Sequence, residues 1–234
     1  MANNNRYLYL SHNSLFCSVN WSCDEGEWIN CPQAIAIVTG PASNLLKAER
    51  LALNLLARCS TIATNARALA DESSAVKLAG TRKTTPGFRL VEKYALLVGG
   101  VDTHRFNCTD CVMLKDNHID LLKEQGIDLK DAISLVKQAA SFTAKVEVEC
   151  RSIADAQISI ESGADIVMLD NFIPSADEIS GLKGLNPRLI IELSGGINKQ
   201  NVHLYPNDPS IILSLGEFTH SPGKLLDFSF KIIK

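Results

Sequence analysis

Apolar and polar residues alternate in two stretches of the first part of the chain, which is the period of a β-strand. These stretches, residues 17–24 and 33–39, flank a turn-forming Asp-Glu-Gly at residues 24–26. The pattern predicts a β-hairpin with a loop of about three to five residues. Two strands do not form a stable sheet by themselves, so we expect them to pack on another surface.

The period changes after Pro41, where apolar residues take helical spacing. Five of them recur at intervals of four and three residues and predict one long amphipathic helix over residues 48–71: Leu55, Cys59, Ile62, Ala66 and Leu69. We therefore place a domain boundary here, with a small first domain over residues 1–45 and a larger domain, led by the helix, over residues 46–221.

The rest of the chain alternates β-rich runs with helical patterns. Helical spacing recurs over residues 129–140, and again over 153–160 between a Ser152 N-cap and a Gly163 stop. Recurrent βαβ units fit a doubly wound sheet or a barrel. Polar or Gly residues end every strand, which is typical of a barrel mouth, so we predict an α/β barrel. The six predicted parallel strands are residues 77–82, 111–115, 144–149, 165–170, 189–194 and 211–216.

Composition excludes several classes of protein. The 234 residues are 46% hydrophobic, but no apolar run reaches the ~18 residues of a membrane-spanning helix, and the N-terminus lacks a signal-peptide core. Seven cysteines without a secretory signal favour reduced thiols. A net charge of -3 gives no overall basic field for nucleic acid. We expect a cytoplasmic protein with no nucleic-acid or membrane partner.

Basic residues nevertheless gather between residues 81 and 118. Arg82, Lys83, Arg105 and Lys115 lie at or near predicted strand ends, where they would direct several cations at one place. Such a site suits an anionic substrate with carboxylates or phosphates. A solvated charged surface is the alternative, but the Arg-Lys-Thr-Thr-Pro-Gly run at a strand-to-loop junction disfavours it.

Two carboxylates end consecutive apolar strands in the same region. Glu149 and Asp170 could hold Mg²⁺ or sugar hydroxyls, and they could stabilise positive charge at an anomeric carbon. A buried ion pair with Lys145 or the basic cluster is the alternative. Glu147 should face the same side as Glu149, because side chains alternate along a strand.

Small residues follow the last two predicted strands. Barrels commonly bind phosphate there through backbone N–H groups, although tight turns can also require Gly. The residues concerned are Ser194, Gly195, Gly196, Ser214 and Gly216. Glu217 places an acid beside this loop, which His220 and Ser221 could offset.

These residues lie in longer stretches that resemble the quinolinate phosphoribosyltransferase family, from about Ser14 to the C-terminus. The central block is more similar to animal than to bacterial members. The stretches that carry the resemblance are residues 49–63, 80–94, 104–105, 115–118, 146–149, 168–171 and 194–197.

The resemblance implies an incomplete α/β barrel with a partial N-terminal α/β sandwich domain, on which residues 222–234 pack. It also implies transfer of phosphoribosyl from phosphoribosyl pyrophosphate to quinolinate with decarboxylation, giving nicotinate mononucleotide, pyrophosphate and CO₂ in NAD biosynthesis. It further implies Mg²⁺ without an organic cofactor, and a homo-oligomer, a dimer or a hexamer, with active sites shared between subunits.

The resemblance assigns roles to individual residues. The quinolinate carboxylates would be held by Arg82, Lys83, His104, Arg105 and Lys115, with Arg50 from the neighbouring subunit. The ribose hydroxyls and Mg²⁺ would meet Glu149 and Asp170. The 5'-phosphate would be held by Ser194, Gly195, Gly196, Ser214 and Gly216. The expected catalytic residues are Lys83, Lys115, Glu149 and Asp170.

The two ends of the chain depart from the family pattern. The family has further helices and a strand where this sequence has residues 1–13, so we expect a truncated domain with an unpaired sheet edge and a weakened assembly. We expect residues 228–234 to form the family's return strand or helix.

Three other functions stay open at this stage. A truncated non-catalytic isoform could bind ligand or full-length subunits. The barrel could belong to the molybdenum-transport pyrophosphorylase-like branch, although the animal-like block argues against it. A lyase could use Lys115 to form a Schiff base, because a lysine at a strand end inside a cavity can have a lowered pKa.

Overall fold

The chain divides into two compact units in this computed structural model, which describes residues 17–73 and 75–233. One unit is Met1–Thr61 with Lys224–Lys234, and the other is Ile62–Gly223. The predicted domain boundary, after residue 45, lies near the start of the long helix. The boundary between the two observed units lies within that helix, between Thr61 and Ile62. The divergent segment 1–13 and the start of the resemblance at Ser14 lie outside the described residues. Within those residues, none of the helices combines the length and apolar character that crossing a bilayer requires.

The smaller unit contains the predicted antiparallel hairpin. Strands β1 (Ser18–Trp21) and β2 (Ala36–Thr39) pair with Ser18 opposite Thr39 and Trp21 opposite Ala36. The prediction of a short loop is wrong, because residues 22–35 connect the two strands. Pairing ends at the Ser22 N–H, which donates to the Ile35 carbonyl at 2.8 Å, and Pro32 has no N–H with which to continue a ladder.

Helix α1 (Ala42–Glu72) is the long helix predicted from the apolar spacing, and it begins earlier than expected. The Pro41 carbonyl accepts hydrogen bonds from the N–H groups of Asn44 and Leu45, which starts the helix directly after the proline. Ile62, Ala66 and Leu69 are buried along its stripe.

The C-terminal residues contribute no regular element. Residues 222–233 contain neither helix nor strand, so the expected return strand or helix is absent from that part of the chain. A hydrogen bond from the Leu226 N–H to Oγ1 of Thr61 at 2.8 Å ties this segment to the smaller unit. The extended backbone pairs with a side chain rather than with a strand.

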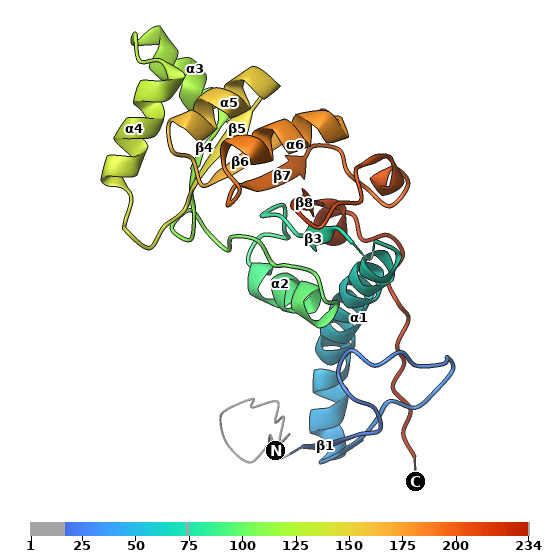
Figure 1. Ribbon diagram of the computed structural model, residues 1–234. Coiled ribbons are helices and arrows are strands. Elements are labelled where there is room, and N and C mark those ends of the chain that lie inside the picture. The colour runs from blue at the N-terminus through green and yellow to red at the C-terminus, as the bar shows by residue number, and fades with distance from the viewer. Residues whose placement is uncertain (1–16, 74, 234) are drawn as a thin grey trace. The chain divides into compact units, whose positions relative to one another are not determined.

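The larger unit is built on a six-stranded parallel sheet (Figure 1), which confirms the six predicted strands. In chain order these are β3 (Lys77–Ala79), β4 (Val112–Leu114), β5 (Val146–Cys150), β6 (Ile166–Asp170), β7 (Ile190–Ser194) and β8 (Ile211–Ser214). Their order in the sheet is β3-β8-β7-β6-β5-β4, so the first strand pairs with the last.

That order distinguishes the two folds that the sequence left open. A barrel places consecutive strands side by side and its first strand beside its last, whereas a doubly wound sheet reverses direction part-way. Here every consecutive pair from β4 to β8 is bonded, and among the described residues no ladder joins β3 to β4. The chain therefore forms the predicted incomplete α/β barrel, open between β3 and β4. An isolated bridge from Ala79 to Asp102 lies at the β3 side of the opening.

Helices cover the outer face of the sheet, where α5 packs against β5 and β6 (Figure 1). Helices α4 (Leu129–Ala139) and α5 (Ile153–Glu161) were predicted, and the Ser152 side chain accepts from the Asp155 N–H as an N-cap should. The helical spacing did not reveal α2 (Arg89–Val98), α3 (Asp116–Glu124), α6 (Ala176–Leu185), the short α7 (Glu217–His220) or the 3-10 helix η1 (Val202–Leu204).

The two faces of the sheet differ in chemistry. Val148, Leu169 and Leu193 are fully buried and point toward the helices. On the opposite face, the register places Glu149 beside Met168, and Met168 beside Glu192. The interior of the open barrel therefore carries carboxylates. Burying them destabilises the fold unless they pair with cations or hydrogen-bond donors, or bind a ligand.

Candidate active site

The carboxyl ends of the strands form one edge of the sheet, and most of the predicted site residues follow that edge. Lys115 comes directly after β4, Glu149 lies near the end of β5, and Asp170 ends β6. Asp170 is opposite Ser194 at the end of β7. Because parallel strands share one direction, these side chains surround one mouth.

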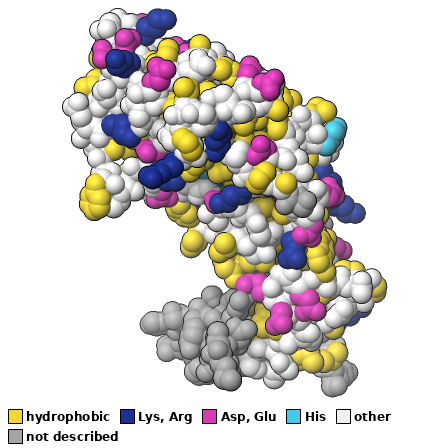
Figure 2. Space-filling model, viewed as in Figure 1, with side chains coloured by type: hydrophobic (Ala, Val, Ile, Leu, Met, Phe, Trp, Pro, Cys, Tyr) yellow, Lys and Arg dark blue, Asp and Glu magenta, His cyan; other side chains and the backbone are white. Residues whose placement is uncertain are grey.

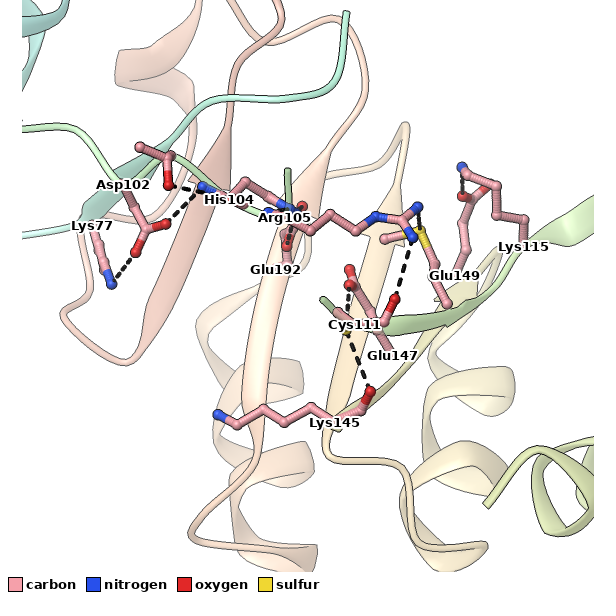
Figure 3. Close-up of polar contacts among 12 residues, drawn as sticks. Lys77, Asp102, His104, Arg105, Cys111, Lys115, Lys145, Glu147, Glu149 and Glu192 are labelled. Atoms are coloured by element: carbon pink, nitrogen blue, oxygen red, sulfur yellow. Dashed lines mark hydrogen bonds and ion pairs between the residues drawn. The ribbon is translucent and has the colours of Figure 1, made fainter. Parts of the chain in front are cut away.

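Lys115 and Glu149 form an ion pair at this mouth, with 2.5 Å between Nζ and Oε2. The Glu149 side chain is only 8% exposed, while Lys115 is 41% exposed. Figure 3 shows the two side chains side by side, with Lys145 at the other end of β5. Of the ion-pair partners considered for Glu149, the structure shows one from the basic cluster, Lys115, and not Lys145, which comes directly before the amino end of the strand.

Asp170 is the second carboxylate of the mouth. Burial, followed by the negative charge of Glu149, raises the pKa of Asp170 above its ordinary value, while the charge of Lys115 opposes the rise. The Asn171 side-chain amide donates to Asp170 Oδ2. A carboxylate whose ionisation is disfavoured by burial and by a neighbouring negative charge forms a site that a cation or hydroxyl donors would stabilise.

Arg82 and Lys83 lie in the loop after β3. Arg82 Nη1 is 3.0 Å from Cys108 Sγ. A Cβ built on Gly216 would lie 3.0 Å from Cδ of Lys83, so Lys83 crosses the small-residue turn after β8. Figure 2 shows Lys and Arg side chains grouped with acidic ones on the visible face of the larger unit.

Arg105 extends from the segment before β4 across that strand. Its Nη2 lies 3.0 Å from Met113 Sδ, and its Nη1 donates to the Cys111 carbonyl at 3.4 Å. The preceding residue, His104, takes a left-handed φ of 55°. Its N–H donates to Asp102 Oδ1 at 2.7 Å, which stabilises this uncommon backbone conformation.

His104 is part of a buried cluster that the sequence did not reveal. Its Nε2 lies 3.0 Å from Oε2 of Glu192 on β7, and Glu147 of β5 faces the same space (Figure 3). Burial alone would lower the pKa of His104, but its hydrogen bond to Glu192 and the charges of Glu192 and Glu147 raise it. Burial and then the charge of Glu192 raise the pKa of Glu147 to about 7.

The three side chains offer ligand atoms within 4.8 Å of one another, which is close enough for a metal ion. The tautomer of His104 opposes that use. Nδ1 accepts a hydrogen bond from the Arg105 N–H at 2.7 Å, so in the neutral imidazole the proton is on Nε2 and points to Glu192. A metal ligand needs Nε2 without a proton. These hydrogen bonds therefore disfavour a metal ion at this cluster.

The loops after β7 and β8 have the form expected of a phosphate site. Gly195 and Gly196 take φ values of 98° and 63°, which favour glycine. Ser214 is 3% exposed, and its Oγ has no hydrogen-bond partner among the described residues. A cavity of about 330 Å³ beside the loop is lined by residues that include Gly196 and His220. The negative charge of Glu217 counts against phosphate binding at this loop, but its carboxylate accepts a hydrogen bond from the Lys199 N–H at 2.8 Å.

Arg50 is the one predicted site residue in the smaller unit. It is exposed on α1 and lines a separate cavity of about 340 Å³ with residues 224–228. Its role at an active site of a neighbouring subunit stays a prediction.

Comparison with known proteins identifies the family of this chain. The profile of the quinolinate phosphoribosyl transferase C-terminal domain matches residues 61–231, and that of the N-terminal domain matches residues 8–60. The chain belongs to the quinolinate phosphoribosyltransferase family. The match begins a little before Ser14, where the resemblance was placed, and the two profiles meet where the two compact units divide.

Members of the family align with nearly the whole chain. The human nicotinate-nucleotide pyrophosphorylase [carboxylating] is 44% identical over 93% of this chain and 74% of its own length. The protein of that name from Dictyostelium discoideum is 42% identical over 95% and 79%. The crystal structure of NadC from Streptococcus pyogenes superimposes with a TM-score of 0.79, at 36% identity over 92% of this chain and 75% of that one. These likenesses favour the family's transferase activity over the Schiff-base lyase and the molybdenum-transport branch.

Several residues of this region were not singled out from the sequence. Glu192 lies inside the apolar strand Ile-Ile-Glu-Leu-Ser, and a charge in such a run was the signal available. Arg89, Glu92 and Lys93 lie on α2, within the Gly80-to-Tyr94 stretch that carries the resemblance.

Proposed function

We propose that this protein transfers the phosphoribosyl group of phosphoribosyl pyrophosphate to quinolinate and decarboxylates it. The products are nicotinate mononucleotide, pyrophosphate and CO₂, a step of NAD biosynthesis. The observation that carries the proposal is the arrangement of cations, carboxylates and a glycine turn around one barrel mouth in a chain of this family.

The cations give the mouth its affinity for a dicarboxylate. Arg82 and Lys83 follow β3, Arg105 precedes β4 and Lys115 follows it, and each would bind or orient a quinolinate carboxylate. His104 differs from them, because both of its ring nitrogens already have partners. In this arrangement Nδ1 of His104 accepts a hydrogen bond from the Arg105 N–H, so His104 would act by positioning Arg105.

The carboxylates suit the sugar. As the bond from ribose C1 to pyrophosphate breaks, positive charge develops at C1, and the anionic side chains of Glu149 and Asp170 would stabilise it. The pyridine nitrogen of quinolinate forms the new bond to C1 and becomes cationic. The bond from C2 to its carboxylate then breaks, CO₂ leaves, and the electron pair left on C2 takes up a proton.

Mg²⁺ fits the same residues. Glu149 and Asp170 offer hard oxygen ligands, and burial followed by the charge of Glu149 raises the pKa of Asp170, so a bound cation would favour its ionised form. Bound Mg²⁺ would neutralise the charge of phosphoribosyl pyrophosphate. The orphan Ser214 Oγ and the N–H groups of the Gly195-Gly196 turn would hold the 5'-phosphate.

We also propose a cytoplasmic homo-oligomer in which Arg50 completes the site of a neighbouring subunit. Seven free cysteines support a reducing compartment. The exposed position of Arg50 on α1 leaves it free to meet another chain.

The test is formation of nicotinate mononucleotide by the purified chain with quinolinate, phosphoribosyl pyrophosphate and Mg²⁺. Activity that Arg82→Ala abolishes supports the proposal. A folded protein that binds neither substrate would overturn it. A protein that binds both substrates without turnover, and that co-purifies with a longer homologue, would identify the non-catalytic isoform.

A further inference from the structure

Helix α2 carries a charged stripe on its inward face. Arg89, Glu92 and Lys93 are spaced at i, i+3 and i+4, so they lie on one side, where an amphipathic helix would normally bury apolar residues. Glu92 is 0% exposed and Lys93 is 3% exposed. Three buried or half-buried charges at one helix end cost stability, which indicates a task other than packing.

Arg89 joins the two segments that carry the cations of the site. Its Nη2 donates to the Arg82 carbonyl at 3.3 Å, and its Nη1 donates to the Phe106 carbonyl at 2.9 Å. Its Nε donates to Thr84 Oγ1 at 3.0 Å. One planar guanidinium therefore fixes the loop after β3 and the segment before β4 to the same point.

Glu92 and Lys93 hold the same two segments. Glu92 accepts from the Thr85 N–H at 3.0 Å and from the Thr85 hydroxyl at 2.8 Å. Lys93 donates to the Thr103 carbonyl, directly before His104 and Arg105. Each of these six bonds ends on a backbone group or a short side chain within two residues of a candidate quinolinate ligand.

We propose that Arg89, Glu92 and Lys93, which we call the α2 clamp, are positioning residues that set the specificity for the dicarboxylate. The clamp crosses the place where the barrel is open, between β3 and β4, where the described residues form no full ladder but a single bridge, from Ala79 to Asp102, with the Gly80 N–H donating to the Asp102 carbonyl at 2.8 Å. The side-chain bonds of the clamp add to that bridge and extend the connection to the loops that carry Arg82 and Arg105. The proposal rests on the proposed function, and it assigns a role to residues that touch no substrate themselves.

The clamp predicts different effects on the two substrates. Arg89→Lys keeps the charge but loses the planar fork, so the KM for quinolinate should rise about tenfold, as loss of one or two hydrogen bonds implies. The KM for phosphoribosyl pyrophosphate should change less than about twofold, because the three hydrogen bonds of the Arg89 guanidinium end on Arg82, Thr84 and Phe106, outside the turns after β6, β7 and β8. Lys130→Gln, an exposed change on α4, is the matched control.

A second variant, at an exposed residue, tests the clamp if Arg89→Lys fails to fold. Thr85 is exposed, and Thr85→Val removes the hydroxyl that donates to Glu92 without opening the core. We expect a smaller rise in the quinolinate KM, about threefold, and cooperative unfolding at a slightly lower temperature, because the buried Glu92 loses one donor but keeps the Thr85 N–H. Adding Arg82→Lys to Arg89→Lys should raise the quinolinate KM by less than the product of the separate effects, because both act on one contact.

The outcomes separate the clamp from the proposed function. Equal increases in both KM values, or independent effects in the double variant, would show a merely structural role for Arg89 and overturn the clamp. A wild-type chain that does not bind quinolinate in calorimetry would instead overturn the proposed function.

Discussion

The ammonium of Lys115 lies 2.5 Å from Oε2 of Glu149, and this ion pair lies at the barrel mouth. Glu149 is almost fully buried and needs a counter-ion, since an unpaired buried carboxylate is strongly disfavoured. The same two residues act in opposite directions on Asp170. Burial and the charge of Glu149 raise the pKa of Asp170, whereas the charge of Lys115 lowers it.

The charge of Lys115 should therefore influence the pH below which the affinity for phosphoribosyl pyrophosphate falls. Because the pKa of Asp170 is raised, Asp170 takes up its proton at a higher pH than an ordinary aspartate does, and binding that needs the ionised form weakens there. In Lys115→Met the pKa of Asp170 should rise further, and the acidic limb should move to higher pH. The measurement is the affinity for phosphoribosyl pyrophosphate with Mg²⁺ between about pH 4 and about pH 8.

Lys145→Met is the matched control for this prediction, because it makes the same substitution at the amino end of β5, away from the mouth (Figure 3). Its acidic limb should coincide with that of the wild type. An acidic limb that stays in place in Lys115→Met, with only a lower affinity at every pH, would show that Lys115 does not influence Asp170.

Glu147 should make the folded protein less stable at neutral pH than at acidic pH. Burial and then the charge of Glu192 raise its pKa from 4.5 to about 7, so the folded state keeps a proton that the unfolded chain releases near 4.5. Stability is then lost as the pH rises from about 4.5 to about 7, and it levels off above that range. Glu147→Gln lacks this titration. The free energy of unfolding of the variant minus that of the wild type should therefore be larger at about pH 8 than at about pH 5, by roughly 2 to 3 kcal/mol.

Urea unfolding of both proteins at the two pH values measures that difference. Glu161→Gln, a change of the same chemistry at the exposed end of α5, should leave the pH dependence unaltered. If Glu147→Gln and the wild type lose stability in parallel between the two pH values, Glu147 does not carry the proton assigned to it.

The sheet could be predicted from the sequence because its strands are buried on the helix side. Runs such as Asp165-Ile-Val-Met-Leu-Asp bring apolar residues together and end in a polar one, and both features survive in β6. Strand ends could also be located, which brought Lys115, Glu149 and Asp170 to one mouth. The barrel's opening between β3 and β4 could not be seen, since it depends on which strands pair and not on any local pattern.

The inward charges could not be predicted for a different reason. Helical periodicity assumes that the buried stripe is apolar, whereas α2 buries Glu92 and Lys93 and so escaped detection as a helix. Glu147 and Glu149 were placed on the same side correctly, because alternation along a strand is local. That Glu147 meets Glu192 and His104 follows from three segments far apart in the sequence, and only the fold brings them together.

Gly195 should be more sensitive to substitution than other glycines of positive φ. A Cβ at this position would lie 2.7 Å from the Asn171 backbone nitrogen, and its φ of 98° is strained for any other residue. Because backbone cannot move aside as a flexible side chain does, Gly195→Ala should lower the free energy of unfolding by about 2 to 4 kcal/mol. It should also raise the KM for phosphoribosyl pyrophosphate at least about tenfold, since the turn that offers N–H groups to the phosphate is displaced.

Gly126 offers the matched control, with a φ of 78° and no atom within 4 Å of an added Cβ. Gly126→Ala adds only the left-handed strain, and it should cost about 1 kcal/mol while both KM values stay unchanged. Thermal or urea unfolding with steady-state kinetics on the two variants decides the matter. Equal stability losses would mean that Asn171 yields to the new methyl group. In that case the close approach of β6 and β7 at this turn is not what orders the phosphate loop.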